Sequence, residues 1–188
     1  NDGGLFAQWL NLFRMNETTL RAVLKSFFEV FPEGFVLSSE RSLILVGSNG
    51  PIILDEPRAR EVLARPALSA RLGRHGVRDA NDLLWYYVLA RGEALALAGD
   101  SPGNLDRNIL SEVELARLTR DPKGADDPEA ILRAASRMDP THLLEDNTPE
   151  RLAQFADYLI AQESFDKAQA AIQQLRAGDP DAAQSLEL

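Results

Sequence analysis

The run LFAQWL at residues 5–10, which follows the pair Gly3-Gly4, decides how this chain begins to fold. A tight turn followed by a short apolar run predicts a buried β-strand over residues 5–10. The sequence NETT at residues 16–19 then caps a helix, whose apolar residues recur at helical spacing until Pro32 ends it. A strand and a long helix are therefore the first two elements that we expect.

A β-hairpin is expected next. Residues 34–38 and 42–46 are strand-like runs, and Glu40-Arg41 between them fits a hairpin turn. The predicted sheet is small and has three strands. One strand, a long helix and a hairpin are hard to explain as a complete fold.

The remainder of the chain has helical patterns. We expect two short helices within residues 58–72, which Pro66 separates, a helix over 79–89 and a short helix over 93–98. Residues 121–128 are rich in Asp, Pro and Gly and predict a linker. The predicted fold class is α+β, or an α/β fragment, with an α/β part over residues 1–120 and a helical tail over 121–188.

The tail is predicted to hold helices over residues 128–137, 149–162 and 164–177. Its apolar and small residues fall close to the spacing of one tetratricopeptide repeat. These positions are Leu152, Phe155, Ala156, Leu159, Phe165, Ala168, Ile172, Leu175 and Pro180. A single repeat cannot bury its own face, so it packs on neighbouring helices. Two interpretations of the tail remain open. It is either a repeat that binds a peptide or an ordinary helical hairpin that covers the α/β part.

Composition narrows the classes of function. The 188 residues include no cysteine, which excludes disulfides, thiolate zinc sites and a cysteine nucleophile. The net charge of −9 argues against a large phosphate-binding surface and an anionic membrane, and it is compatible either with solubility alone or with a cationic ligand such as a polyamine. No apolar run approaches the roughly 20 residues that span a bilayer. We therefore expect a cytoplasmic chain without nucleic acid or membrane contact.

Three stretches together resemble a known family. They are DGGLFAQW at residues 2–9, VFP at 30–32 after the long helix, and LILVGS at 43–48 in the hairpin. In this order they resemble the final third of a spermidine synthase-like protein, which has the Rossmann-like fold of the S-adenosylmethionine-dependent methyltransferases. The bacterial subgroup that is often fused to membrane segments is the most similar one. The loop DSPGNLDRN at residues 100–108 resembles that subgroup's Asn-Thr-Asp-Asp loop, from which Leu105 and Arg107 depart.

The resemblance covers roughly residues 1–115 and implies that the catalytic parts lie elsewhere. In such proteins the nucleotide binds a glycine-rich loop after the first strand, and an acidic residue at a later strand end holds the ribose. These parts and the catalytic acidic residue would precede Asn1. The resemblance thus implies no cofactor in this chain, while a longer parent protein, with or without a membrane anchor, would use decarboxylated S-adenosylmethionine or S-adenosylmethionine.

We therefore expect a non-catalytic C-terminal region that completes or covers the catalytic domain or mediates oligomerisation. The strand over residues 5–10 would be an open edge, and an unpaired apolar edge invites pairing with another chain. The expected partner is the missing N-terminal half or a second copy. The alternative is an autonomous interaction module on a degenerate methyltransferase scaffold, with a peptide bound to the helical tail.

Four residues are candidates for a substrate cleft. Gln8 and Trp9 come at the end of the predicted strand, where the residues of related enzymes line the substrate cleft. Asn104 and Asp106 lie in a loop whose counterpart in the family borders the active site. Each also has a structural reading: strand-end packing for Trp9, a backbone cap for Gln8, and side-chain to backbone bonds within the loop for the other two. No catalytic or metal-binding residue is predicted. A small enzyme that uses Asn104 and Asp106 is the third and weakest hypothesis.

Overall fold

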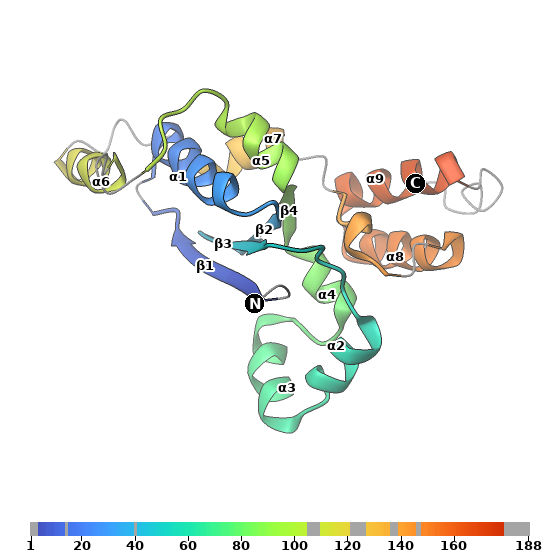
Figure 1. Cartoon of the computed structure of the whole chain (residues 1–188). Helices are drawn as coiled ribbons and strands as arrows, with labels where there is room; N and C mark the ends of the chain where they lie inside the picture. The colour runs from blue at the N-terminus through green and yellow to red at the C-terminus, as the bar shows by residue number, and fades with distance from the viewer. Residues whose placement is uncertain are drawn as a thin grey trace. The chain divides into compact units, whose positions relative to one another are not determined.

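The protein has an α+β fold, seen in a computed structural model (Figure 1). The structure describes residues 4–13, 15–39, 41–104, 110–120, 127–135, 139–145 and 148–178. The chain forms two compact units, residues 1–52 with 88–136 and residues 53–87 with 137–188. This division differs from the boundary that we predicted near residue 120, because the chain leaves the first unit after residue 52 and returns to it at residue 88.

The first unit is built on a four-stranded sheet. Strands β1 (Leu5–Asn11), β2 (Glu33–Ser39), β3 (Ser42–Ser48) and β4 (Tyr87–Ala90) lie in the order β1-β3-β2-β4. Both β1 and β2 pair antiparallel with β3, so β1 and β2 run parallel to each other with β3 between them. The predicted hairpin and a strand over residues 5–10 are confirmed, but this strand is mostly exposed and not buried as predicted. The prediction of three strands is corrected to four.

The fourth strand lies where we predicted a helix over residues 79–89. Helix α4 (Ala80–Trp85) ends early, and the chain then enters β4. The ammonium group of Lys167 donates hydrogen bonds to the carbonyl oxygens of Trp85 and Tyr87, where α4 ends and β4 begins. Tyr87, Val88 and Leu89 are buried. Tertiary contacts thus override the local helical pattern.

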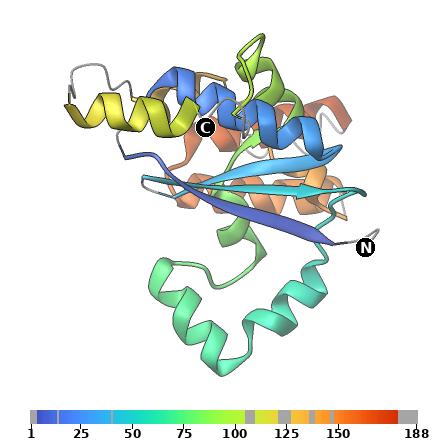
Figure 2. The same ribbon diagram turned by 60° about the vertical axis from the view of Figure 1, so that its left-hand side comes forward.

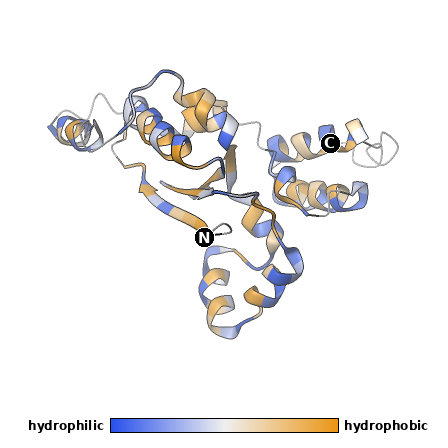
Figure 3. Ribbon diagram, in the orientation of Figure 1, coloured by the Kyte–Doolittle hydropathy of each residue, from blue (hydrophilic) through white to orange (hydrophobic). Residues whose placement is uncertain are grey.

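Helix α1 (Glu17–Val30) covers one face of the sheet (Figure 2). The side chain of Asn16 accepts a hydrogen bond from the Thr19 amide at 2.9 Å, which caps the helix as its sequence predicts. The apolar face of α1 packs on the inner side chains of β2 and β3, and Figure 3 shows the apolar character of these elements. This core includes Leu20, Val23, Leu24, Phe27, Phe28, Val36, Leu43 and Leu45.

Three further helices complete the first unit. Helix α5 (Arg91–Ala98) and helix α7 (Pro128–Ala135) add residues to the same core, and helix α6 (Leu110–Arg120) packs on α1. The guanidinium of Arg91 donates to the carbonyl oxygens of Phe31 and Phe28 at 2.7 and 3.1 Å. This side chain therefore fastens the start of α5 to the end of α1.

The second unit is helical. Helix α2 (Glu56–Leu63), helix α3 (Pro66–Leu72), the 3-10 turn η1 (Gly73–His75) and α4 form its first part, and Pro66 separates α2 from α3 as predicted. The 3-10 turn η3 (Thr141–Leu143), helix α8 (Pro149–Ala161) and helix α9 (Phe165–Gly178) form the second part. Helices α8 and α9 pack together as a hairpin. Pro180, the last residue of the repeat-like pattern, lies outside the described residues.

Candidate functional site

The outer edge of β1 is the first candidate site. The amide of Leu12 donates to the Arg41 carbonyl at 2.8 Å, which continues the β1–β3 ladder by one pair. Because hydrogen-bonded and non-hydrogen-bonded pairs alternate in an antiparallel ladder, Gln8 bonds to β3 and its neighbours Ala7 and Trp9 point their backbone groups outward. The described part of the chain places no strand on that outer side. Strand β1 therefore presents a row of free donors and acceptors.

The side chains of this edge strand are apolar but exposed. Leu5, Phe6 and Trp9 retain 64%, 51% and 63% of their surface exposure. On the α1 side, the Phe6 ring lies 5.5 Å from the Phe31 ring, with only part of its surface covered. An apolar strand with an open edge is a template for pairing with another chain.

The sheet face opposite α1 also carries exposed apolar side chains, next to those of β1. Trp9 pairs with Ile44, and Leu37 pairs with Ile44 from the other side. Side chains alternate between the two faces of a strand, so these residues share the face opposite Leu43 and Leu45, which are buried against α1. Ile44 is 38% exposed and Leu37 is half-buried. The exposed apolar surface thus reaches from Trp9 to Ile44, whereas Val46 on the same face is buried.

Gln8 and Trp9 do not line one cleft. Both lie inside β1, because the strand extends to Asn11. As neighbours in a strand they point to opposite faces, with Gln8 opposite Leu45 and Trp9 opposite Ile44. Only Trp9 stands on the sheet face that α1 leaves open.

Asn104 fastens a loop. Its amide donates to the Ala22 carbonyl at 3.3 Å, and its carbonyl accepts from the Ser26 hydroxyl at 3.1 Å. Its side chain accepts a hydrogen bond from the Ser111 amide at 3.0 Å, in the first turn of α6. These contacts fit the loop-bracing reading of Asn104, and they do not join it to Gln8 or Trp9. Asp106 lies outside the described residues.

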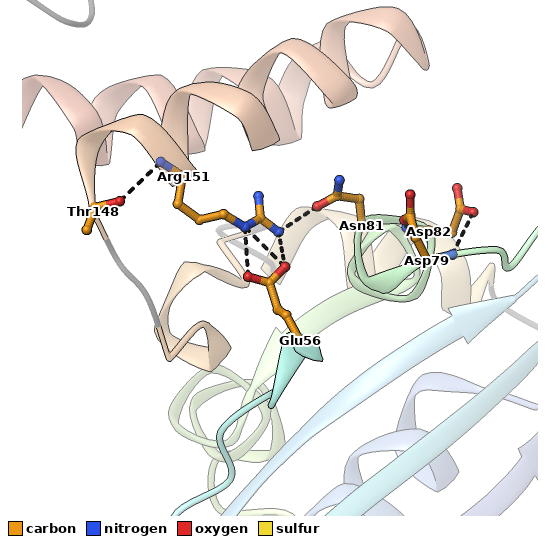
Figure 4. A network of polar contacts seen from close by, with 6 residues as sticks. All are labelled: Glu56, Asp79, Asn81, Asp82, Thr148 and Arg151. Carbon is orange, nitrogen blue, oxygen red and sulfur yellow. Dashed lines mark hydrogen bonds and ion pairs between the residues drawn. The ribbon is translucent and has the colours of Figure 1, made fainter. Parts of the chain in front are cut away.

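A polar network in the second unit is the other candidate site (Figure 4). The Arg151 guanidinium donates to both carboxylate oxygens of Glu56, at 2.6 to 3.1 Å, and to the Asn81 side-chain oxygen at 2.6 Å. The Arg151 and Glu56 side chains are only 11% and 19% exposed. Tyr158 donates to Asp82 at 2.6 Å, and burial together with this carboxylate raises the pKa of Tyr158. The network joins α8 to α2 and α4.

This network fits a structural role. Its cationic and acidic groups are bonded to one another, and Asp82 also accepts bonds from the Arg78 and Asp79 amides in the capping box of α4. The face of α8 that carries Arg151 and Tyr158 is thus covered by other helices of its own unit. Sequence reasoning missed the network because Glu56 and Arg151 are 95 positions apart.

Lys167 is the one lysine whose pKa is clearly perturbed in the described part of the chain. Burial lowers its pKa to about 8. Its ammonium group bonds to the Trp85 and Tyr87 carbonyls and lies 5.5 Å from the centre of the Trp85 ring, while the Trp85 indole donates to the Ser164 hydroxyl at 2.6 Å. Lys167 therefore anchors α9 to the end of α4.

The described residues contain neither a cluster of metal-binding side chains nor a membrane-spanning helix. No group of three or more His, Cys, Asp or Glu side chains there is arranged to hold a metal ion. None of the helices in the same part of the chain combines the length and the apolar character that a bilayer crossing requires. No family model, curated protein or solved structure matches this chain.

Proposed function

We propose that this chain is the C-terminal region of a spermidine synthase-like protein, without catalytic activity on its own, and that it completes the sheet of the catalytic domain through β1. The observation that carries the proposal is the open edge of β1, whose apolar side chains are exposed although they belong to the same sheet as a well-buried core. A strand of this composition is stable in water when a neighbour covers it.

The topology supports the same proposal. Strands β1 and β2 are parallel, and α1 connects them in the sequence. A strand, a crossover helix and a parallel strand form the repeating unit of Rossmann-like folds. In a complete Rossmann-like fold helices cover both faces of the sheet, whereas Trp9 and Ile44 are exposed on one face here. A preceding half-sheet with its own helices would cover both the edge and this face.

The proposal assigns the chemistry to that preceding half. S-adenosylmethionine or its decarboxylated form would bind there, and the reaction would be aminopropyl or methyl transfer in a cytoplasmic protein. Ligands of open α/β sheets bind outside the carboxyl ends of the parallel strands. Trp9 lies near that end of β1 on the face opposite α1, so among the described candidates Gln8, Trp9 and Asn104 it is the residue that we propose to border the substrate cleft. Asp106, outside the described residues, stays a candidate.

The alternative function is an autonomous interaction module with a peptide on the α8–α9 hairpin. The face of α8 that carries Arg151 and Tyr158 is already bonded to α2 and α4. This occupancy favours the reading of the hairpin as a structural cover over its reading as a peptide-binding repeat.

Calorimetric titration with methylthioadenosine tests the proposed function. The isolated chain is expected to give no binding heat, and the native gene product purified from its source cell is expected to bind the nucleoside. Binding by the isolated chain would contradict the proposal, and so would a native product that does not bind.

A further inference from the structure

Residues 58–78 concentrate positive charge in an otherwise acidic chain. This segment, which we call the arginine arm, contains six arginines and one glutamate, so it carries +5, while the remainder of the chain carries −14. It comprises most of α2, all of α3 and η1, and the residues up to Arg78. The net charge of −9 hides this local reversal.

All six arginines of the arm are exposed. Arg58 forms an ion pair with Glu61, and Arg74 donates to the Ala70 carbonyl at 3.2 Å. Among the described residues, no ion pair holds the other four side chains, Arg60, Arg65, Arg71 and Arg78. Neither α2 nor α3 contains a buried residue, and α3 packs on α2 and η1. Within the described part of the chain, four of the six arginines in the arm are therefore not neutralised by an ion pair.

Interaction with helix dipoles accounts for the positions of only some of these arginines. Arg60 and Arg71 lie in the last turns of α2 and α3, where a cation is favourable. Arg65 lies at the N-cap of α3, where a positive charge opposes the helix dipole, and its side chain makes no capping bond. Arg78 contributes its backbone amide to the cap of α4, while its guanidinium is exposed. In the described part of the chain, neither of these two guanidinium groups is held by a capping bond or an ion pair.

The residue type points to the chemistry of the ligand. The arm contains arginine and no lysine. The planar guanidinium binds carboxylate and phosphate groups with two parallel hydrogen bonds, which an ammonium group cannot do. The arm is therefore suited to short-range recognition of planar or branched anions in addition to long-range attraction.

Size and charge favour a carboxylate-rich protein segment over a nucleic acid. Helices α2 and α3 are about 12 Å and about 10 Å long, so the arm matches a short run of about six residues in extended form, roughly 20 Å. A duplex or a membrane surface is longer than the arm and carries many more negative charges, so the net charge of −9 opposes its approach more strongly. A short acidic segment carries fewer charges and meets less of that repulsion.

We propose that the arginine arm is a docking surface for a carboxylate-rich segment of a partner protein. Arg65, Arg71 and Arg78 provide bidentate contacts, and Arg60 adds long-range attraction. This surface is independent of the open β1 edge, and its failure would leave the proposed function untouched.

Fluorescence anisotropy with a fluorescein-labelled hexaglutamate peptide tests the docking surface on the full chain. The peptide is expected to bind at low salt and to be released as salt screens the charges. The triple variant Arg65→Gln, Arg71→Gln, Arg78→Gln should weaken binding at least tenfold. The triple variant Arg41→Gln, Arg120→Gln, Arg176→Gln removes the same charge from exposed positions elsewhere and should bind within twofold of the wild type.

Two further comparisons test whether the contacts are bidentate and whether the ligand is a carboxylate-rich protein segment. A triple arginine-to-lysine variant of Arg65, Arg71 and Arg78 keeps the charge and should still weaken binding severalfold, because bidentate bonds are lost. Undiminished binding by this variant would overturn the bidentate contacts. Absence of peptide binding, equal loss in the control variant, or tighter binding of a 16-base-pair duplex or of phosphatidylserine vesicles would each overturn the carboxylate-rich partner.

Discussion

Trp9 lies directly opposite Ile44 in the β1–β3 ladder, and both side chains stand on the sheet face that α1 does not cover. This pair marks the place where the first unit ends without a cover of its own. The outward backbone groups of β1 lie beside the same surface. The edge and the face together account for an apolar strand that is exposed along most of its length.

Proline substitutions distinguish the two sides of β1. Ala7→Pro removes an outward N–H and should leave the β1–β3 ladder intact, since proline is tolerated at such edge positions. Gln8→Pro removes an N–H that points to β3 and leaves a carbonyl without its partner, which should lower the free energy of unfolding by about 1–3 kcal/mol more. Urea denaturation of both variants measures the difference. Equal destabilisation would contradict the assignment of the outer edge.

Exposure predicts unequal effects of two aromatic substitutions. Phe28 lies on the buried face of α1 and is fully buried, so Phe28→Ala should cost about 3–5 kcal/mol of unfolding free energy. Trp9→Ser should cost about 0.5 kcal/mol or less in the isolated chain, because most of the indole is already in water. Urea denaturation of the monomeric chain measures both values. A large loss for Trp9→Ser would show that this face is covered within the chain itself.

The Glu56–Arg151 pair should behave as a coupled unit. Arg151→Met leaves the Glu56 carboxylate in a site that is mostly closed to water, and the expected cost is about 3 kcal/mol. The double variant Glu56→Gln, Arg151→Met should recover part of this loss, because the stranded charge is gone. A double-mutant cycle gives the coupling energy, and additive single effects would contradict the role of the pair.

Lys167 should give the second unit a distinct pH dependence. Its pKa is about 8 in the folded chain and about 10.5 when unfolded, so between these values the unfolded chain binds more protons. The free energy of unfolding contributed by this residue therefore rises with pH across that window. Chemical denaturation at pH 7.5 and pH 10, compared with Lys167→Met, isolates the effect. A difference between wild type and variant that does not change with pH would contradict the lowered pKa.

The sequence predicted those elements whose causes are local. Asn16 caps α1, Pro66 separates α2 from α3, and a compact turn joins β2 to β3, so each could be located from neighbouring residues. Strand β4 was missed because its neighbour in the sheet is β2, which lies far from it in the sequence. The arginine arm was missed for a different reason, since the total charge of the chain conceals a local excess of the opposite sign.

The division into two units was also beyond local reasoning. Residues 53–87 look like a continuation of the α/β part, yet they belong with the helical tail. The bridge between Leu54 and Leu144 and the bonds of Arg151 to Glu56 and Asn81 account for this grouping. Such contacts between distant segments leave no periodic pattern in the sequence.

The mass of the native protein in its source cell tests the central claim most directly. An immunoblot with an antibody raised against this chain is expected to show a band well above 20.7 kDa, because we propose that a further part of the same protein pairs with the open edge of β1. A single band at about 20.7 kDa would contradict the account, and the partner of β1 would then have to be another chain.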